Sequence, residues 1–132
     1  MNVGFVAFSP MANGLLTGAY GKDSKFDSKL DYRSTMPQFT PEAAEENREL
    51  LDLLNNMATG KHATPAQLSL AWMLCKKPYI VPIPGSRKVE RMRENAGAAE
   101  VQLSAAEVAQ IDHILDTIPM SAVFGGTKVI NK

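Results

Sequence analysis

Residues 83–95 read Ile-Pro-Gly-Ser-Arg-Lys-Val-Glu-Arg-Met-Arg-Glu-Asn, and this stretch carries the strongest structural signal in the sequence. The apolar run 79–84 predicts a strand, although its prolines limit the pairing it can make. The pattern after it predicts a helix over residues 86–96, so Gly85 and Ser86 lie between a strand end and a helix start. Free N–H groups and the positive end of the helix dipole meet at such a junction, which therefore predicts an anion site.

Charged and polar side chains surround this junction. Arg87 and Lys88 flank it, and Arg91 follows Arg87 by one helical turn on the same face. Arginine can bind a phosphate through two parallel hydrogen bonds, while Glu94 and Asn95 offer acceptor and amide groups to an adenine or a ribose. The alternative is that the serine is an ordinary helix cap and the arginines form a solvated helix face.

The rest of the chain divides into short elements. Residues 3–8 are apolar and predict a strand buried on both faces. The stretch 11–18 is rich in turn residues, and residues 19–39 are polar and irregular, which is typical of a binding loop or lid. Hydroxyl caps predict three further helices, which begin after Thr40, Thr64 and Ser104. The first two have a first-turn proline, the third has a capping box with Glu107, and the first is expected to end near Gly60.

Periodicity also assigns side chains to the core or to the surface. The helix over 86–96 is expected to have a basic outer face and three inward residues, Val89, Met92 and Ala96. Cys75 lies on the apolar stripe of the helix after Thr64 and is expected to be buried and inert. The two histidines, His62 and His113, are expected to be exposed.

The elements follow in the order strand, loop, helix, helix, strand, helix, helix and tail, with the tail over residues 119–132. Two strands joined by a helical crossover predict a parallel βαβ unit. A two-stranded parallel sheet leaves both edges open, and open edges pair with other chains. The order therefore predicts a part of something larger, or a chain that associates.

Composition narrows the class of function. The chain has 132 residues with 14 basic and 14 acidic side chains, a balance that argues against a general nucleic-acid binder. No apolar run is long enough to cross a membrane, and two unclustered histidines do not predict a metal site. One cysteine cannot form an internal disulfide, so a reduced, cytoplasmic setting is expected.

The motif over residues 83–95 resembles the C-terminal NADP motif of the aldo-keto reductases, and further stretches resemble the same family in matching order, at 4–10, 14–18, 31–42 and 63–72. The resemblance covers nearly the whole chain. It implies an α/β fold that is the C-terminal fragment of a TIM (β/α)8 barrel, from the seventh strand onward, with two parallel strands and about four helices. Residues 1–132 would then form a single partial domain, with ligands at the carboxyl ends of its strands.

The same resemblance implies roles for individual residues in binding NADP(H). The cofactor pyrophosphate would be lined, partly through backbone N–H groups, by Ser9, Met11, Asn13 and Leu15, and Gly14 would let that backbone come close. The adenosine 2′-phosphate would be held by Gly85, Ser86, Arg87 and Arg91, and the adenine by Glu94 and Asn95. Arg91 is the residue expected to set a preference for NADP(H) over NAD(H).

The catalytic Asp, Tyr, Lys and His of the family lie on strands before the seventh, so the resemblance places none of them in this sequence. The parent reaction would be the NADPH-dependent reduction of aldehydes or ketones, and the chain alone is expected to be inactive. Two alternatives stay open: a non-catalytic NADP(H)-binding or oligomeric interaction module, or a truncated relic. The expected partners are a second copy of the chain or a complementing N-terminal part of the barrel, with no nucleic acid, membrane or metal.

Overall fold

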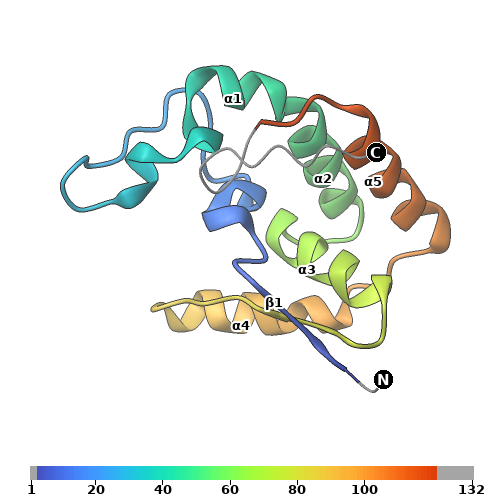
Figure 1. Cartoon of the computed structure of the whole chain (residues 1–132). Helices are drawn as coiled ribbons and strands as arrows, with labels where there is room; N and C mark the ends of the chain where they lie inside the picture. Colours follow the sequence, from blue (N-terminus) through green and yellow to red (C-terminus); the bar gives the residue numbers. More distant parts are fainter. Residues whose placement is uncertain (1–2, 122–132) are drawn as a thin grey trace.

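The computed structural model of the chain describes residues 3–121, and its two strands run side by side in parallel (Figure 1). β1 (Phe5–Phe8) pairs with β2 (Ile80–Ile83) in a register that places Phe5 opposite Ile80 and Phe8 opposite Ile83. A backbone hydrogen bond of 2.8 Å from Phe5 N to Tyr79 O extends the pairing by one residue. The predicted parallel pair with a helical crossover is confirmed.

Helices make up most of the remaining described chain. Its α-helices are α1 (Pro41–Glu46), α2 (Arg48–Gly60), α3 (Pro65–Lys76), α4 (Val89–Gly97) and α5 (Ala105–Thr117). Short 3₁₀ helices form η1 (Ala12–Thr17), η2 (Tyr32–Thr35), η3 (Pro37–Phe39) and η4 (Ala98–Glu100). Within residues 3–121, no helix combines the length and the apolarity that crossing a membrane requires. Of the predicted tail, residues 122–132 lie outside the described part of the chain.

Three helices begin where their capping residues predict. Thr40 Oγ1 accepts a hydrogen bond of 3.1 Å from the backbone of Ala43 at the start of α1. Thr64 and Ser104 each form a full capping box, with Gln67 at α3 and with Glu107 at α5. A cap of this kind contributes about 0.5–2 kcal/mol, so these local signals are strong enough to fix the helix starts.

The single helix expected from Thr40 to Gly60 is instead two helices, α1 and α2, which meet at a kink at Asn47. Asn47 is buried, and its side-chain amide both donates to Ser121 Oγ (2.7 Å) and accepts from Ser121 N (3.2 Å). A buried amide needs such partners, and the partner here lies 74 residues away along the chain. The interruption therefore coincides with a tertiary contact that no local pattern reports.

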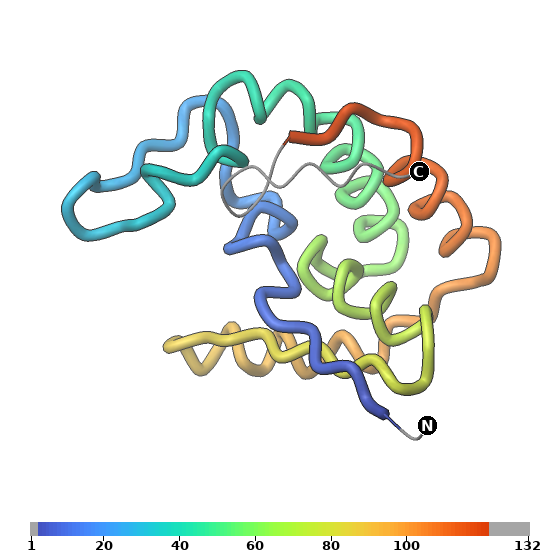
Figure 2. Tube along the Cα trace, viewed as in Figure 1, coloured from blue at the N-terminus to red at the C-terminus, as the bar shows by residue number. Residues whose placement is uncertain are grey.

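The core lies between α2, α3 and α5, which pack together on one side of the strand pair (Figure 2). Its buried cluster consists of Leu50, Leu54, Ala58, Leu68 and Ile111. Leu68 is completely buried, and α3 contacts α2 on one side and β2 on the other. α3 is thus the element that connects the helical core to the strands.

The expectation that residues 3–8 are buried on both faces is wrong for this chain. Phe5 is 58% exposed and Phe8 is 73% exposed, while Val81 of β2 is 54% exposed. A parallel strand needs helices or strands over both of its faces to be buried. Among the described residues, α3 is the helix that contacts β2 closely, so the apolar strand pattern remains uncovered on the opposite face.

Four more side chains that were assigned to the core are exposed. Val89 and Met92 of α4 are each 57% exposed, and Ala96 is exposed as well, because the main contacts of α4, with α3 and η4, involve the other part of its surface. Cys75 is exposed because it lies in the last turn of α3, beyond the part of that helix that meets the core. The two histidines are exposed, as expected.

A polar cluster joins α3 to α5 beside the core. Asp112 accepts a hydrogen bond of 2.9 Å from Trp72 Nε1 and one of 2.6 Å from Lys76 Nζ. The hydrogen bond from Lys76, followed by the weaker effect of Trp72, holds the pKa of Asp112 below its ordinary value. The ionised carboxylate is therefore favoured in the folded chain.

This shift predicts a loss of stability in acid. Because the folded-state pKa of Asp112 is lowered from the ordinary value of 3.8, its contribution to stability is present above that pH and is lost as the pH falls through the folded-state value. We expect the melting temperature, followed by circular dichroism from pH 6 to pH 2.5, to fall less steeply in Asp112→Asn than in the wild type. Asp116→Asn, an exposed carboxylate on the same helix, is the matched control. Equal acid sensitivity of Asp112→Asn and the wild type would contradict the assignment.

Candidate functional site

A cavity of about 380 Å³ lies where both strands end. Its two walls come from the chain after β1 and from the chain after β2, with one side formed by the start of α3. The cavity is lined by Ser9, Pro10, Met11, Asn13, Gly14, Tyr32, Ala66, Pro84, Gly85, Ser86, Arg91 and Asn95. In parallel α/β folds the carboxyl ends of the strands are where ligands bind. The two predicted segments, about seventy residues apart in the sequence, thus meet in one cavity.

The wall after β1 has an unusual backbone. Ser9, Ala12 and Asn13 all have positive φ angles, of 48°, 48° and 58°. Residues other than glycine rarely adopt this conformation, and such strain concentrates at functional sites. Gly14, at φ 100°, follows them directly, and a Cβ there would come within 2.9 Å of the Tyr20 ring. Glycine is therefore required at this position both by the backbone angle and by the space available.

Asn13 is the centre of the polar contacts in this wall. Its Oδ1 accepts hydrogen bonds from Ser9 Oγ (3.2 Å) and from Tyr32 Oη (3.1 Å). Its Nδ2 is buried, and no acceptor among the described residues reaches it. The two hydroxyl groups therefore fix the orientation of the amide, and its N–H donors are left over for another group.

The wall after β2 differs from its predicted form. α4 begins at Val89 rather than at residue 86, and Lys88 occupies the capping position without a side-chain cap. Ser86 Oγ instead accepts a hydrogen bond of 3.1 Å from Lys88 N, so the serine stabilises the turn before the helix. The interpretation of Ser86 as an ordinary helix cap is therefore wrong, because the helix starts too late for it. A Cβ built on Gly85 would meet nothing within 4 Å, so this turn is open.

Arg91 and Asn95 line the cavity from one face of α4, one helical turn apart. The Arg91 side chain is half-exposed and forms a loose ion pair with Glu94, with 3.8 Å between Nη1 and Oε2. An ion pair this exposed contributes little and yields easily to a stronger anion. Arg91 is thus the one guanidinium group among the cavity-lining residues.

Three of the eleven residues predicted for the site do not line this cavity. Arg87 is exposed on the surface of the turn. Glu94 pairs with Arg91, and its backbone carbonyl accepts a hydrogen bond of 2.9 Å from Gln67 Nε2. Leu15 is buried among core residues and lines a different, apolar cavity. The other eight lie together in the cavity: Ser9, Met11, Asn13, Gly14, Gly85, Ser86, Arg91 and Asn95.

The irregular stretch 19–39 was expected to be typical of a binding loop or lid, and Figure 2 shows it extending away from the helices. Sequence reasoning missed that Tyr32 of this stretch lines the cavity. Tyr20, Phe26 and Phe39 form an aromatic cluster with ring centroids 5.0–5.7 Å apart. The Arg33 guanidinium lies 4.7 Å from two of these rings and donates to Asp31, which lowers the pKa of that carboxyl group. This cluster positions the loop so that the neighbouring Tyr32 reaches the cavity.

Sequence reasoning did not predict Tyr32 as a site residue, because its hydrogen bond to Asn13 joins residues nineteen positions apart, and hydrophobic periodicity does not report such a contact.

No group of three or more His, Cys, Asp or Glu side chains is placed to hold a metal ion in residues 3–121. The site therefore consists of hydroxyl and amide groups with one arginine.

The sequence of this chain is similar to known proteins over most of its length. The sequence pattern of the Aldo/keto reductase family matches residues 1–116. The chain is 39% identical over 115 residues to Aldo-keto reductase yakc of Schizosaccharomyces pombe, a protein whose name includes NADP(+), and the match covers 87% of this chain and 34% of yakc. It is 36% identical over 111 residues to Aldo-keto reductase str7 of Strobilurus tenacellus, covering 84% of this chain and 33% of str7. The chain thus spans about a third of the length of these relatives.

Solved structures agree on the fold. The thermostable aldo-keto reductase Tm1743, solved with the inhibitor epalrestat, matches with a TM-score of 0.54 and 28% identity, over 83% of this chain and 28% of that one. The glycerol dehydrogenase AKR11B4 of Gluconobacter oxydans matches with a TM-score of 0.76 and 22% identity, over 91% of this chain and 36% of that one. The predicted fold, a part of a (β/α)8 barrel, is confirmed.

Proposed function

This chain belongs to the aldo/keto reductase family, and from that premise we propose that its cavity binds the phosphate groups of NADP(H). The main support for the proposal is that two segments far apart in the sequence meet in one cavity at the ends of β1 and β2. One segment supplies the strained turn around Asn13, and the other supplies Ser86 and Arg91. Neither segment alone forms a site of this size.

The residues present fit a phosphorylated dinucleotide. A buried, unpartnered N–H donor at Asn13 costs stability unless another group accepts from it, and a phosphate oxygen is a suitable acceptor. The open turn at Gly85 leaves room for a ligand to approach the backbone. The guanidinium of Arg91 is able to bind a phosphate group through two hydrogen bonds, and the Ser86 hydroxyl lies in the same wall. In this proposal Arg91 holds the adenosine 2′-phosphate, and the turn around Asn13 holds the pyrophosphate.

For a full-length protein of this family, the proposed reaction is the reduction of an aldehyde or a ketone. When bound, NADPH supplies the hydride for such a reaction. The part played by this chain is to bind and orient the cofactor, with Arg91 and Asn95 on one wall and Asn13 on the other. By resemblance, the catalytic Asp, Tyr, Lys and His belong to earlier strands, so the isolated chain is proposed to be inactive.

A second role, as a non-catalytic or oligomeric interaction module, has an observation of its own. The apolar face of β1 and β2 is exposed, and faces of this kind mark sites of association. A second copy of the chain, or a complementing N-terminal part of the barrel, would cover this face. This role is compatible with binding of NADP(H) in the cavity.

The proposed function predicts saturable binding of NADPH by the 132-residue chain, measured by the rise in NADPH fluorescence on titration. Binding of NADH, titrated in parallel, is expected to be weaker by about tenfold or more, because a charged hydrogen bond contributes roughly 1.5–3 kcal/mol. Adding an aldehyde to the same samples is expected to cause no loss of NADPH absorbance. Equal affinities for the two cofactors, or no binding by a chain that circular dichroism shows to be folded, would refute the proposal.

A further inference from the structure

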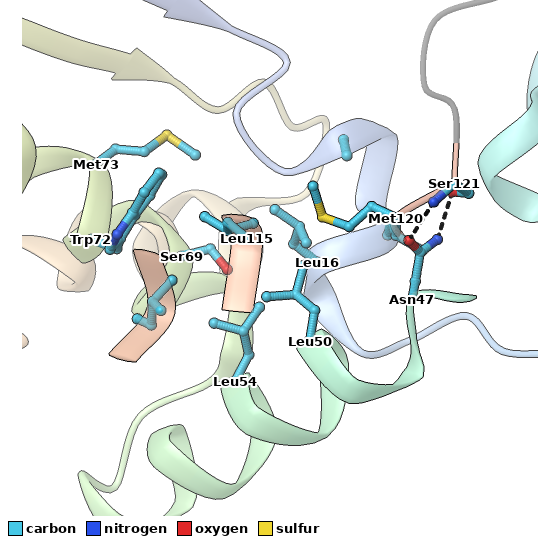
Figure 3. A pocket seen from close by; sticks show the side chains of 13 residues that line it. Leu16, Asn47, Leu50, Leu54, Ser69, Trp72, Met73, Leu115, Met120 and Ser121 are labelled. Atoms are coloured by element: carbon cyan, nitrogen blue, oxygen red, sulfur yellow. Dashed lines mark hydrogen bonds between the residues drawn. The ribbon is translucent and has the colours of Figure 1, made fainter. Parts of the chain in front are cut away.

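A second cavity, of about 210 Å³, lies inside the helical part of the molecule (Figure 3). Its walls come from η1, α2, α3 and α5, and it is closed at one end by Met120 and Ser121. η1 contributes to both cavities, since Ala12 and Leu15 line this one while Asn13 and Gly14 line the proposed cofactor cavity. The second cavity is nevertheless separate in its chemistry, because its lining is almost entirely apolar.

The polar groups in its wall are already engaged with one another or with the backbone. Asn47 and Ser121 are joined by two hydrogen bonds, which Figure 3 shows as dashed lines. Ser69 Oγ donates to the Pro65 carbonyl at 2.8 Å, and Trp72 Nε1 donates to Asp112. A water molecule in a cavity needs two to four hydrogen-bonding partners. The polar groups in this wall already form hydrogen bonds elsewhere, so they are poor partners for a water molecule. The wall therefore selects for an occupant that makes no hydrogen bonds.

The size and shape of the lining indicate the class of occupant. An engineered apolar cavity of roughly 150 Å³ binds benzene, so a cavity of about 210 Å³ can accept a somewhat larger ring. Trp72 offers an aromatic surface, and Met73 and Met120 offer adaptable thioether side chains. Trp72, Met73 and Leu115 are only half-buried, so this side of the cavity reaches the molecular surface.

We propose that the cavity between η1, α2, α3 and α5 is a binding site for a small uncharged apolar molecule, of the size of one alkyl-substituted aromatic ring. Leu50, Leu54 and Ile111 form the buried floor of this site, and Trp72 and Met73 border its entrance. The site is independent of the proposed cofactor cavity, because its lining contains no charged side chain and would bind no phosphate. Its test can therefore succeed or fail whatever the outcome of the NADPH titration.

The test is a titration of the full chain, labelled with ¹³C at the methionine methyl groups, with ethylbenzene as the probe. We expect the methyl signals of Met73 and Met120 to shift saturably, while that of Met92, exposed on α4, stays unchanged. The melting temperature is expected to rise, because a ligand that binds only the folded state stabilises it. Benzoate is the matched charged probe and is expected to cause no shift, since the cavity offers its carboxylate no partner.

A substitution in the cavity wall provides a second, independent test of binding at this site. Leu115→Phe adds bulk to the cavity and is expected to abolish the saturable shift at Met73, whereas Leu74→Phe, outside the cavity on α3, is expected to leave it unchanged. If ethylbenzene moves neither methyl signal in the wild type, another part of the chain fills the cavity and the proposal is wrong. Equal shifts with benzoate, or equal shifts at Met92, would overturn it as well, because binding would then not be specific to this site.

Discussion

Replacing Arg91 with alanine is expected to weaken NADPH binding by about 10- to 100-fold, because a hydrogen bond to a charged group contributes roughly 1.5–3 kcal/mol. Arg91 is the single guanidinium group among the residues that line the proposed cofactor cavity. Its side chain is 49% exposed, and within residues 3–121 its one ion pair is the loose contact with Glu94. The arginine is therefore free to turn toward a phosphate at little cost, and its removal leaves that phosphate without a cation.

The matched control is Arg93→Ala, which removes the same charge from the same helix at a position that does not line the cavity. Both variants and the wild type would be titrated with NADPH and NADH at one fixed salt concentration, because exposed charges are screened by salt. Arg91→Ala is expected to lose NADPH affinity and to change NADH affinity much less. A loss of equal size in Arg93→Ala would show that the net charge of α4, rather than a specific contact, attracts the cofactor.

Replacing Leu68 with alanine is expected to lower the free energy of unfolding by about 2–5 kcal/mol, since buried leucines leave a cavity when they are truncated. Leu68 is completely buried at the centre of the cluster that joins α2, α3 and α5. α3 also contacts β2, so damage at this point is transmitted to the strands that support the cofactor cavity. Urea denaturation followed by circular dichroism measures the change.

Leu74→Ala is the control for this prediction, since Leu74 lies on the same helix and is 42% exposed. We expect it to cost about 1 kcal/mol or less, because little apolar surface is withdrawn from water at that position. If both variants lost the same stability, the change would reflect the helix and not the core. The core would then lie elsewhere than in the cluster around Leu68.

Local capping signals correctly predicted the starts of three helices in this chain, although α4 begins at Val89 and not at residue 86 as expected. Thr40, Thr64 and Ser104 each precede a helix in the sequence, and each caps that helix in the structure. Such caps act within four residues of themselves, so nothing distant in the fold can conceal them. The parallel strand pair followed from the same kind of reasoning, because a helical crossover leaves few other arrangements.

Predictions of which strand and helix faces are buried were less successful. The apolar pattern of residues 3–8 resembles that of a buried strand, yet Phe5 and Phe8 are exposed in this chain. Val89 and Met92 have helical spacing but no described neighbour that covers them, and Cys75 lies past the end of the core. A pattern states which face is apolar, but burial depends on whether another element lies against that face.

The sequence by itself determined the order of the two strands and the main helices and the starts of three helices, and it predicted two segments that would bind phosphate. Only the tertiary structure decided that these segments meet in one cavity, that Tyr32 donates a hydrogen bond to Asn13, and that α1 ends at Asn47, whose side chain contacts Ser121. The physical reason for this difference is the distance along the chain over which each kind of interaction acts. Caps and dipoles act within one turn of helix, whereas the cavity and its supporting hydrogen bonds join residues that become neighbours only after the chain has folded.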